Sequence, residues 1–228
     1  MKIDLGVTGS DSVEIESFCK MAHNLGFSGF ATQGRFDEPV TLLNMMSIYR
    51  RAEIKGKKAG SIRKQIDRVR RLSAVVVLEI GTSETTNWAI ENNRIDLLTV
   101  TTRGDHSLRA TTASMAASAG VALEIQIAPL LQISGFSRSK ILKVYRETIT
   151  TAIENGMMVI LTSGATNPMG LRSPVAMKHI GMLLGLSKLE SNQAVDEYPV
   201  RIVQKNLKKM EPGYITPGVE VLQQGDKK

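Results

Sequence analysis

The residues of this chain that could do chemistry are mostly cations, and they cluster. The segment from Arg50 to Arg71 holds ten basic residues and two acids, a net charge of +8. The whole chain carries a formal net charge of +7, so the rest of the sequence is close to neutral. Charge localised in this way favours binding to a phosphate backbone. The alternative is a solvated helix face, as in many basic runs. The ten residues are Arg50, Arg51, Lys55, Lys57, Lys58, Arg63, Lys64, Arg68, Arg70 and Arg71.

Groups suited to catalysis are few. Asp4 stands near the end of the first apolar run, and Asp105 precedes His106 in a polar loop. A His beside an Asp could act as a general base, but a helix cap within a loop explains the pair better. The chain has three histidines and one cysteine, Cys19, so few of the usual zinc ligands are present. We therefore predict no catalytic residue and no metal ligand.

Two further features could bind an anion. The small polar loop Thr162–Asn167 contains Gly164 and could present backbone N–H groups to a phosphate, although a tight strand-to-helix turn is the simpler interpretation. Arg172 stands just before Ser173-Pro174, a sequence typical of a helix start. Because a helix start is already electropositive, an arginine there indicates that an anion binds at this position.

The elements that must position these residues alternate between strands and helices. Seven apolar runs without polar alternation are typical of parallel strands buried on both faces. They are residues 3–7, 27–31, 48–54, 74–80, 97–101, 121–127 and 157–161. Between them we predict helices, among them one that ends at Gly26, one capped by Ser61, and one over Ser137–Glu154.

This alternation predicts an α/β fold, and a TIM-barrel-like (β/α) barrel with about seven parallel strands is our first choice. An open doubly wound sheet is the alternative, but no Gly-x-Gly-x-x-Gly or Walker motif follows a strand. No eighth strand is evident, and extra helices follow residue 173. We predict one barrel domain over residues 1–209 and a flexible tail over residues 210–228.

Composition narrows the class of protein. The chain has 228 residues, 42% of them hydrophobic and 22% charged, as in an ordinary globular protein. One cysteine excludes an intramolecular disulfide. Aromatic residues make up 4%, too few for a surface that binds single strands mainly by stacking. We see no signal core and no membrane span, and we expect a cytoplasmic protein.

Several blocks together resemble one family. They are Ser163-Gly164-Ala165, Leu171-Arg172-Ser173-Pro174, Leu183-Leu184-Gly185-Leu186, Leu123-Glu124-Ile125 with Pro129-Leu130-Leu131, Val75-Val76-Val77-Leu78, and the run Val203–Lys208 with Asn206. Their order and spacing over about residues 2–209 resemble archaeal ribonuclease P protein component 3, the family of the thirty-kilodalton subunit of eukaryotic ribonuclease P and MRP.

The resemblance implies a TIM-barrel-like protein subunit of the ribonucleoprotein that removes 5′ leaders from precursor tRNA. In that family the RNA is the catalyst, so this chain would belong to an endoribonuclease holoenzyme without supplying catalytic residues. The implied partners are ribonuclease P RNA, other ribonuclease P proteins and, indirectly, precursor tRNA. A small ferredoxin-like subunit would form a heterodimer with this chain, and two such pairs a heterotetramer. No cofactor is expected on the protein, and Mg²⁺ is expected in the RNA active centre.

The family also belongs to a superfamily of metal-dependent phosphoesterases whose first strand ends in His-x-His. In this chain those positions correspond to Gly6 and Thr8, neither of which can supply an imidazole. A stand-alone phosphoesterase that uses carboxylates such as Asp4 and Glu124 is the alternative function. A scaffold that contacts only proteins is a third. For the leading interpretation, the RNA-contact candidates are the ten residues above with Arg35, Arg103 and Arg172, and the family-motif loop is Ser163, Gly164 and Ala165.

Overall fold

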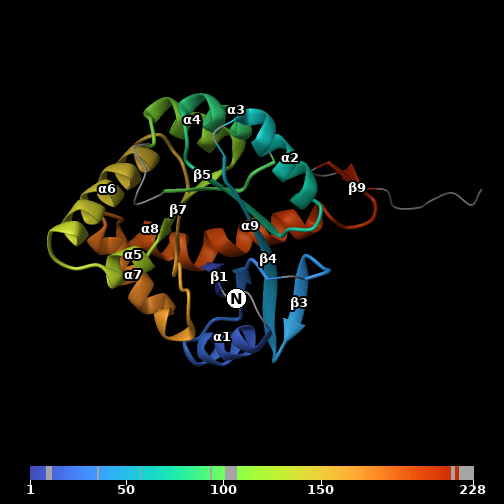
Figure 1. Cartoon of the computed structure of the whole chain (residues 1–228), viewed down its shortest axis with the longest axis horizontal. Coiled ribbons are helices and arrows are strands. Elements are labelled where there is room, and N and C mark those ends of the chain that lie inside the picture. The colour runs from blue at the N-terminus through green and yellow to red at the C-terminus, as the bar shows by residue number, and fades with distance from the viewer. Residues whose placement is uncertain are drawn as a thin grey trace, which may run out of the picture.

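The structure is a computed structural model that describes residues 1–8, 12–34, 36–56, 58–92, 94–100, 107–216 and 219–220. Its centre is a curved parallel sheet with helices packed around the outside (Figure 1). The parallel strands are β1 Ile3–Val7, β2 Gly29–Thr32, β4 Met46–Ile54, β5 Val75–Glu79, β6 Leu97–Thr99, β7 Ala122–Gln126 and β8 Val159–Thr162. Each of the seven predicted runs overlaps one of them, so the predicted barrel-like fold is confirmed.

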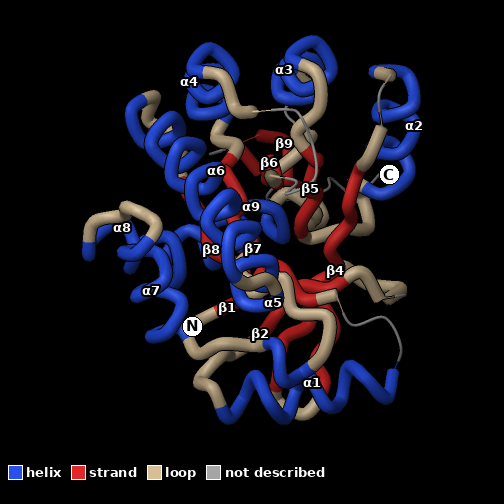
Figure 2. Tube along the Cα trace, turned by 60° about the vertical axis from the view of Figure 1, so that its left-hand side comes forward, coloured by secondary structure: helices blue, strands red, loops and turns tan. Residues whose placement is uncertain are grey.

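The sheet follows the order β1-β2-β4-β5-β6-β7-β8 and is nearly closed. Between its two ends, the Thr8 amide donates to the Ala165 carbonyl at 2.9 Å, and Val7 forms an isolated parallel bridge with Ala165. The tube view in Figure 2 shows the strands enclosed by helices on the outer side. No eighth parallel strand occurs among the described residues.

One strand of the sheet was not predicted. β3, Val40–Leu43, pairs antiparallel with the first half of β4. The turn between them places Asn44 and Met45 in the left-handed region, with φ of 49° and 61°. Two positive φ values are what a two-residue hairpin requires, but such turns normally contain glycine. The sequence therefore carries no hairpin signal here.

The helices follow the predicted order. They are α1 Ser12–Asn24, α2 Ala59–Val69, α3 Ser83–Glu91, α4 Ala110–Ala119, α5 Ala128–Gln132, α6 Gly135–Glu154, α7 Pro174–Leu183, α8 Lys188–Asn192 and α9 Tyr198–Lys208, with a 3₁₀ turn η1 Pro168–Gly170 and a π turn η2 Gln193–Glu197. Ser173 caps α7 as predicted, accepting from the Ala176 amide at 3.3 Å. The Ser61 cap is wrong: the N-cap is Lys58, three residues earlier, because the Lys58 carbonyl already accepts from the Ser61 and Ile62 amides.

Two apolar cores hold the fold together. The larger core lies between the sheet and the outer helices, and the buried Cys19 belongs to it. The smaller core lies inside the barrel, where Ile202 and Val203 of α9 pack with strand residues such as Ile3 and Ala122. After α9, Tyr214–Thr216 (β9) and Val219–Glu220 (β10) pair antiparallel, and the flexible tail over residues 210–228 stays a prediction.

Candidate functional site

The carboxyl ends of the parallel strands surround a polar hollow of about 290 Å³. In a barrel this end normally carries the active site. The charged residues of the lining are Glu53, Glu79 and Lys55, and Lys55 Nζ lies 3.8 Å from Glu53 Oε2 and 4.0 Å from Glu79 Oε2. Lys55, predicted to contact RNA, therefore stands between two carboxylates that offset its charge.

Beneath this hollow, a buried ion pair lies in the barrel interior. Arg51 binds Glu124 through two hydrogen bonds, Nη1 to Oε1 at 2.6 Å and Nη2 to Oε2 at 2.8 Å. Its Nη1 also donates to the Leu5 carbonyl at 2.6 Å, and Nη2 to Glu53 at 3.1 Å. The Arg51 side chain is 1% exposed. The prediction that Arg51 contacts RNA is wrong, since its guanidinium is enclosed and fully occupied.

The electrostatics of the pair favour its charged form. Burial opposes ionisation of Glu124, but Arg51 and the Thr162 hydroxyl outweigh it and lower the pKa of Glu124. Burial likewise opposes the charge on Arg51, but the Glu124 and Glu53 carboxylates raise its pKa. Glu124 is thus committed to Arg51 and is not a free metal ligand or base.

Asp4 and Gly6 complete the interior. Asp4 Oδ1 accepts from the Gly6 amide at 3.0 Å and from the Ser163 amide at 3.1 Å. Burial raises the pKa of Asp4 against these hydrogen bonds. A Cβ added to Gly6 would lie 2.6 Å from the Cβ of Thr162 and 3.1 Å from Glu124 Oε1. A side chain at position 6, ligating or not, would therefore require the surrounding interior to shift.

The loop Ser163, Gly164 and Ala165 joins the two edges of the sheet. The Ser163 amide donates to Asp4, and the Ala165 amide donates to the Ser163 hydroxyl at 3.1 Å. Gly164 has a φ of 62°, which favours glycine. The simpler interpretation of this loop, a tight turn, is consistent with the contacts its amides make.

Arg172 turns toward its own loop. Its Nη1 donates to the carbonyls of Leu171 at 2.7 Å and Met169 at 3.0 Å. Arg50 likewise donates from Nη1 to the Phe36 carbonyl at 2.6 Å. Both guanidinium groups therefore hold loops in place.

The outer face of α2 differs from the interior. Ile62 and Ile66 are buried against the core, while Lys64, Arg68 and Arg71 are exposed and form no ion pair among the described residues. Lys64 and Arg68 are one turn apart on α2, and Arg71 follows two residues after the helix ends at Val69, so the stripe runs along α2 and continues past its end. Lys58, at the start of α2, is also exposed and unpaired within the described ranges. This stripe is the arrangement that the basic segment predicted.

Other predicted contacts are shared with acids or cannot be placed. Arg70 Nη1 lies 2.5 Å from Asp96 Oδ2, and Arg63 Nε lies 3.8 Å from Asp67, which also pairs with Arg94. The predicted contacts Arg35, Lys57 and Arg103 lie outside the described residues, as does the pair Asp105 and His106.

Sequence reasoning missed two cations that the fold brings to Arg70. Lys205 and Lys209 stand at the end of α9, and both Lys205 and Arg70 act electrostatically on Lys209. The lysines were visible in the sequence, but only the packing of α9 reveals their neighbour.

Over the part of the chain that the structure describes, no three His, Cys, Asp or Glu side chains are grouped to hold a metal ion. Within the same residues, no helix is both long and apolar enough to cross a membrane.

Comparisons with known proteins agree on one family. The family model described as RNase P subunit p30 matches residues 1–211. Ribonuclease P protein component 3 of Methanosarcina barkeri is 28% identical over 93% of this chain and 91% of its own length. The protein of the same name from Methanococcoides burtonii is 26% identical over 91% of this chain and 88% of its own length.

Solved structures support the fold. A chain in a cryo-EM structure of archaeal Ribonuclease P with mature tRNA superposes with a TM-score of 0.80, at 19% identity, covering 99% of this chain and all of that one. A crystal structure of an amidohydrolase superposes with a TM-score of 0.61, at 9% identity, covering 91% of this chain and 75% of that one.

Proposed function

This chain belongs to the RNase P subunit p30 family, and we propose that it serves ribonuclease P as a non-catalytic subunit that binds and supports the catalytic RNA. The holoenzyme is the endoribonuclease that removes 5′ leaders from precursor tRNA. The observation that carries the non-catalytic role is the barrel interior. Arg51 and Glu124 neutralise each other there, and Gly6 has no room for a ligating side chain.

The exposed stripe on α2 supports the RNA-binding role. Lys64, Arg68 and Arg71 present positive charge that no carboxylate offsets within the described structure. Such cations position a phosphate backbone and neutralise its charge, without reading bases. Because aromatic residues make up 4% of the chain, shape and backbone contacts to structured RNA suit it better than stacking on unpaired bases.

The partners follow from this role. We propose that the chain assembles with ribonuclease P RNA and other ribonuclease P proteins, that a small ferredoxin-like subunit pairs with it as a heterodimer, and that two such pairs form a heterotetramer. The relative with the same fold was solved in archaeal Ribonuclease P with mature tRNA, which supports an assembly of this kind. Catalytic Mg²⁺ would be held by the RNA, and precursor tRNA would be contacted indirectly.

Reconstitution tests this function directly. The full chain, with and without the partner subunit, is added to the cognate ribonuclease P RNA, and leader removal from precursor tRNA is followed. We expect the protein to stimulate cleavage by the RNA and Asp4→Ala to retain that stimulation. Loss of cleavage by Asp4→Ala in an intact complex, unrestored by added Mg²⁺, would contradict the non-catalytic role.

The alternative, a stand-alone metal-dependent phosphoesterase, has its own test. The purified protein is assayed for bound divalent metal and for hydrolysis of a simple phosphodiester. We expect neither, because Glu124 is held by Arg51 and Asp4 by two backbone amides. Metal-dependent hydrolysis that Glu124→Gln abolishes would favour the alternative.

A further inference from the structure

The helix α9 closes the amino end of the barrel and brings its last turn beside α2. Asn206 donates from Nδ2 to the carbonyl of Ala74, just before β5, at 2.9 Å. Ile202 and Val203, one turn earlier, pack into the inner core. These contacts fix the end of α9 where α2 also ends.

At this position cations from two distant parts of the chain meet. Lys205 and Lys209 are spaced i and i+4 on one side of α9, and Arg70 follows α2. Partial burial and the charges of Lys205 and Arg70 lower the pKa of Lys209, so these groups act on one another. Asp96 acts on Lys209 in the opposite sense, and it already accepts from Arg70 at 2.5 Å and from the Val76 amide at 2.8 Å.

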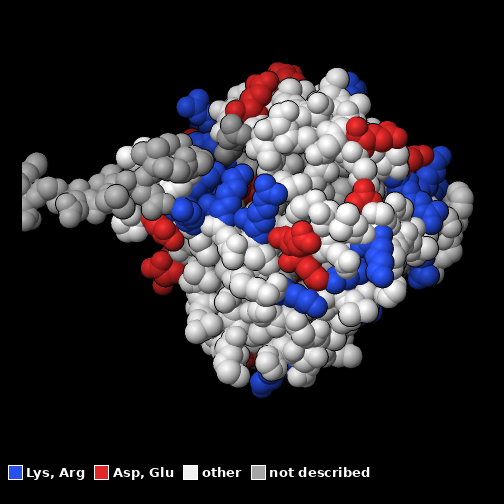
Figure 3. All heavy atoms as spheres, turned by 180° about the vertical axis from the view of Figure 1, so that it is seen from behind, with Lys and Arg blue, Asp and Glu red and all other residues white. Residues whose placement is uncertain are grey.

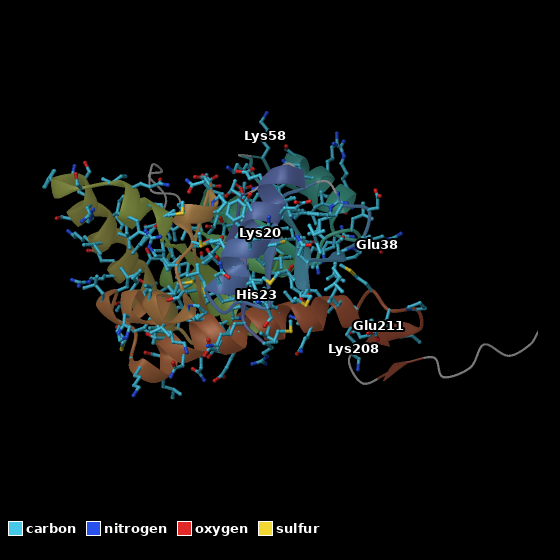
Figure 4. All side chains as sticks on the ribbon, turned by 90° about the horizontal axis from the view of Figure 1, so that it is seen from below. Lys20, His23, Glu38, Lys58, Lys208 and Glu211 are labelled. Carbon is cyan, nitrogen blue, oxygen red and sulfur yellow. The ribbon has the colours of Figure 1, made fainter. Side chains whose placement is uncertain are left out.

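The two ends of the barrel therefore differ in charge balance. At the carboxyl end Lys55 stands between two glutamates, whereas at the amino end Asp96 pairs with Arg70 and acts on Lys209, and Lys205 adds a further positive charge that acts on Lys209. Figure 3 shows one group of Lys and Arg side chains on the side where α2 and the end of α9 lie in Figure 1, and a second group on the opposite side of the same face. In Figure 4, Lys58 at the start of α2 and Lys208 at the end of α9 lie at opposite edges of the molecule.

The helix dipole alone does not explain this group. Lysines are favoured in the last turn of a helix, which accounts for Lys205. It does not account for the placement of Arg70, from another helix, near the same lysines. Crowded like charges disfavour one another until an anion binds among them.

We infer that the amino end of the barrel, at Arg70, Lys205 and Lys209, is a binding surface for the phosphodiester backbone of structured RNA. This inference rests on the proposed function and deepens it by stating which end of the barrel faces the RNA. Arg71, the last residue of the stripe, is exposed and follows Arg70 directly in the chain. The arrangement departs from the usual use of a barrel, in which ligands bind at the carboxyl end.

The test compares two double variants with equal charge loss. Lys205→Gln with Lys209→Gln removes two charges from the amino end, and Arg70 is kept because it holds Asp96. Lys140→Gln with Lys188→Gln removes two exposed charges from α6 and α8, on the other side of the molecule (Figure 1). Affinity of each full-length protein for the cognate ribonuclease P RNA is measured from about 50 to 200 mM salt, with the melting temperature as a check on folding.

For the amino-end variant we expect the slope of log affinity against log salt to become shallower by about 2 units, so that its deficit against the wild type shrinks by roughly tenfold over that range. The control should keep most of the wild-type slope. An unchanged slope in the amino-end variant, or an equal change in the control, would overturn the inference while leaving the proposed function standing. A wild-type protein whose RNA affinity does not depend on salt would overturn both.

Discussion

The segment from Arg50 to Arg71 supplies cations to two very different environments. Inside the barrel, Arg51 is enclosed and makes two hydrogen bonds to Glu124. On the outside, Lys64, Arg68 and Arg71 face solvent without an ion pair in the described structure. The interior cation stabilises the fold, and the exterior ones remain available to a polyanion. A count of charges in a sequence does not separate these roles, because the direction of each side chain decides them.

The local geometry of each element explains that direction. In β4, successive side chains alternate between the two faces of the sheet, so Arg51 points inward while Arg50 reaches the Phe36 carbonyl. In α2 the buried residues Ile62 and Ile66 fix one face, and the stripe lies away from it.

The largest expected effect comes from breaking the interior pair. Arg51→Met leaves Glu124 buried and unpaired, and should lower the free energy of unfolding by about 3–5 kcal/mol. Urea denaturation monitored by circular dichroism measures this change.

The matched control removes both charges. Arg51→Met with Glu124→Leu should recover about half or more of the loss, since an apolar pair carries no uncompensated charge. If the double variant is as unstable as the single one, the hydrogen bonds of Arg51 to Leu5 and Glu53 matter more than its pairing with Glu124.

The exterior stripe gives the next largest effect, on RNA affinity. Lys64→Gln, Arg68→Gln and Arg71→Gln together should make the salt slope of RNA binding shallower by about 2–3 units. Their exposure predicts a change in stability of about 0.5 kcal/mol or less at each site. Filter binding over a salt series provides the measurement, and an unchanged slope would show that the stripe is only a solvated face.

Acid sensitivity sharpens the comparison further. The pKa of Glu124 is lowered in the folded protein, so the pair contributes stability above the ordinary value of 4.5 and loses it as pH falls below that value. Burial raises the pKa of Asp4, so protonation of Asp4 as pH falls favours the folded protein and partly offsets the loss of stability at Glu124. Between about pH 5 and pH 3 the wild type should lose stability more steeply than the double variant, by up to about 1.4 kcal/mol per pH unit. If the free energy of unfolding falls with pH equally steeply in the two proteins, Glu124 is not ionised in the folded wild type.

Arg172 should show the smallest effect. Arg172→Ala removes hydrogen bonds to two carbonyls of its own loop and should cost about 0.5–1.5 kcal/mol of stability. We expect little change in the salt slope of RNA binding. If Arg172→Ala makes the salt slope of RNA binding shallower by a full unit, Arg172 contacts a phosphate.

Local signals account for most of what the sequence predicted. Continuous apolar runs identified all seven parallel strands, because strands buried on both faces tolerate few polar residues. The spacing of the α2 residues also predicted its exposed face. β3 was not predicted because it is a short edge strand, and the turn that follows it contains no glycine.

Long-range contacts account for what the sequence did not predict. The partner of Arg51 is Glu124, 73 positions away, and a buried arginine in a basic run has no local signal. The proximity of Lys209 to Arg70 likewise depends on how α9 packs across the barrel.

One cleavage experiment tests the division between interior and exterior most directly. Ribonuclease P is reconstituted with the wild type, with Arg51→Met/Glu124→Leu, or with the triple α2 variant, and leader removal is measured at several salt concentrations below the melting temperature of each protein. We expect the interior variant to cleave at close to the wild-type rate, and the α2 variant to stimulate cleavage less, with the largest deficit at low salt. Lost cleavage with the folded interior variant, beside normal cleavage with the α2 variant, would contradict this account.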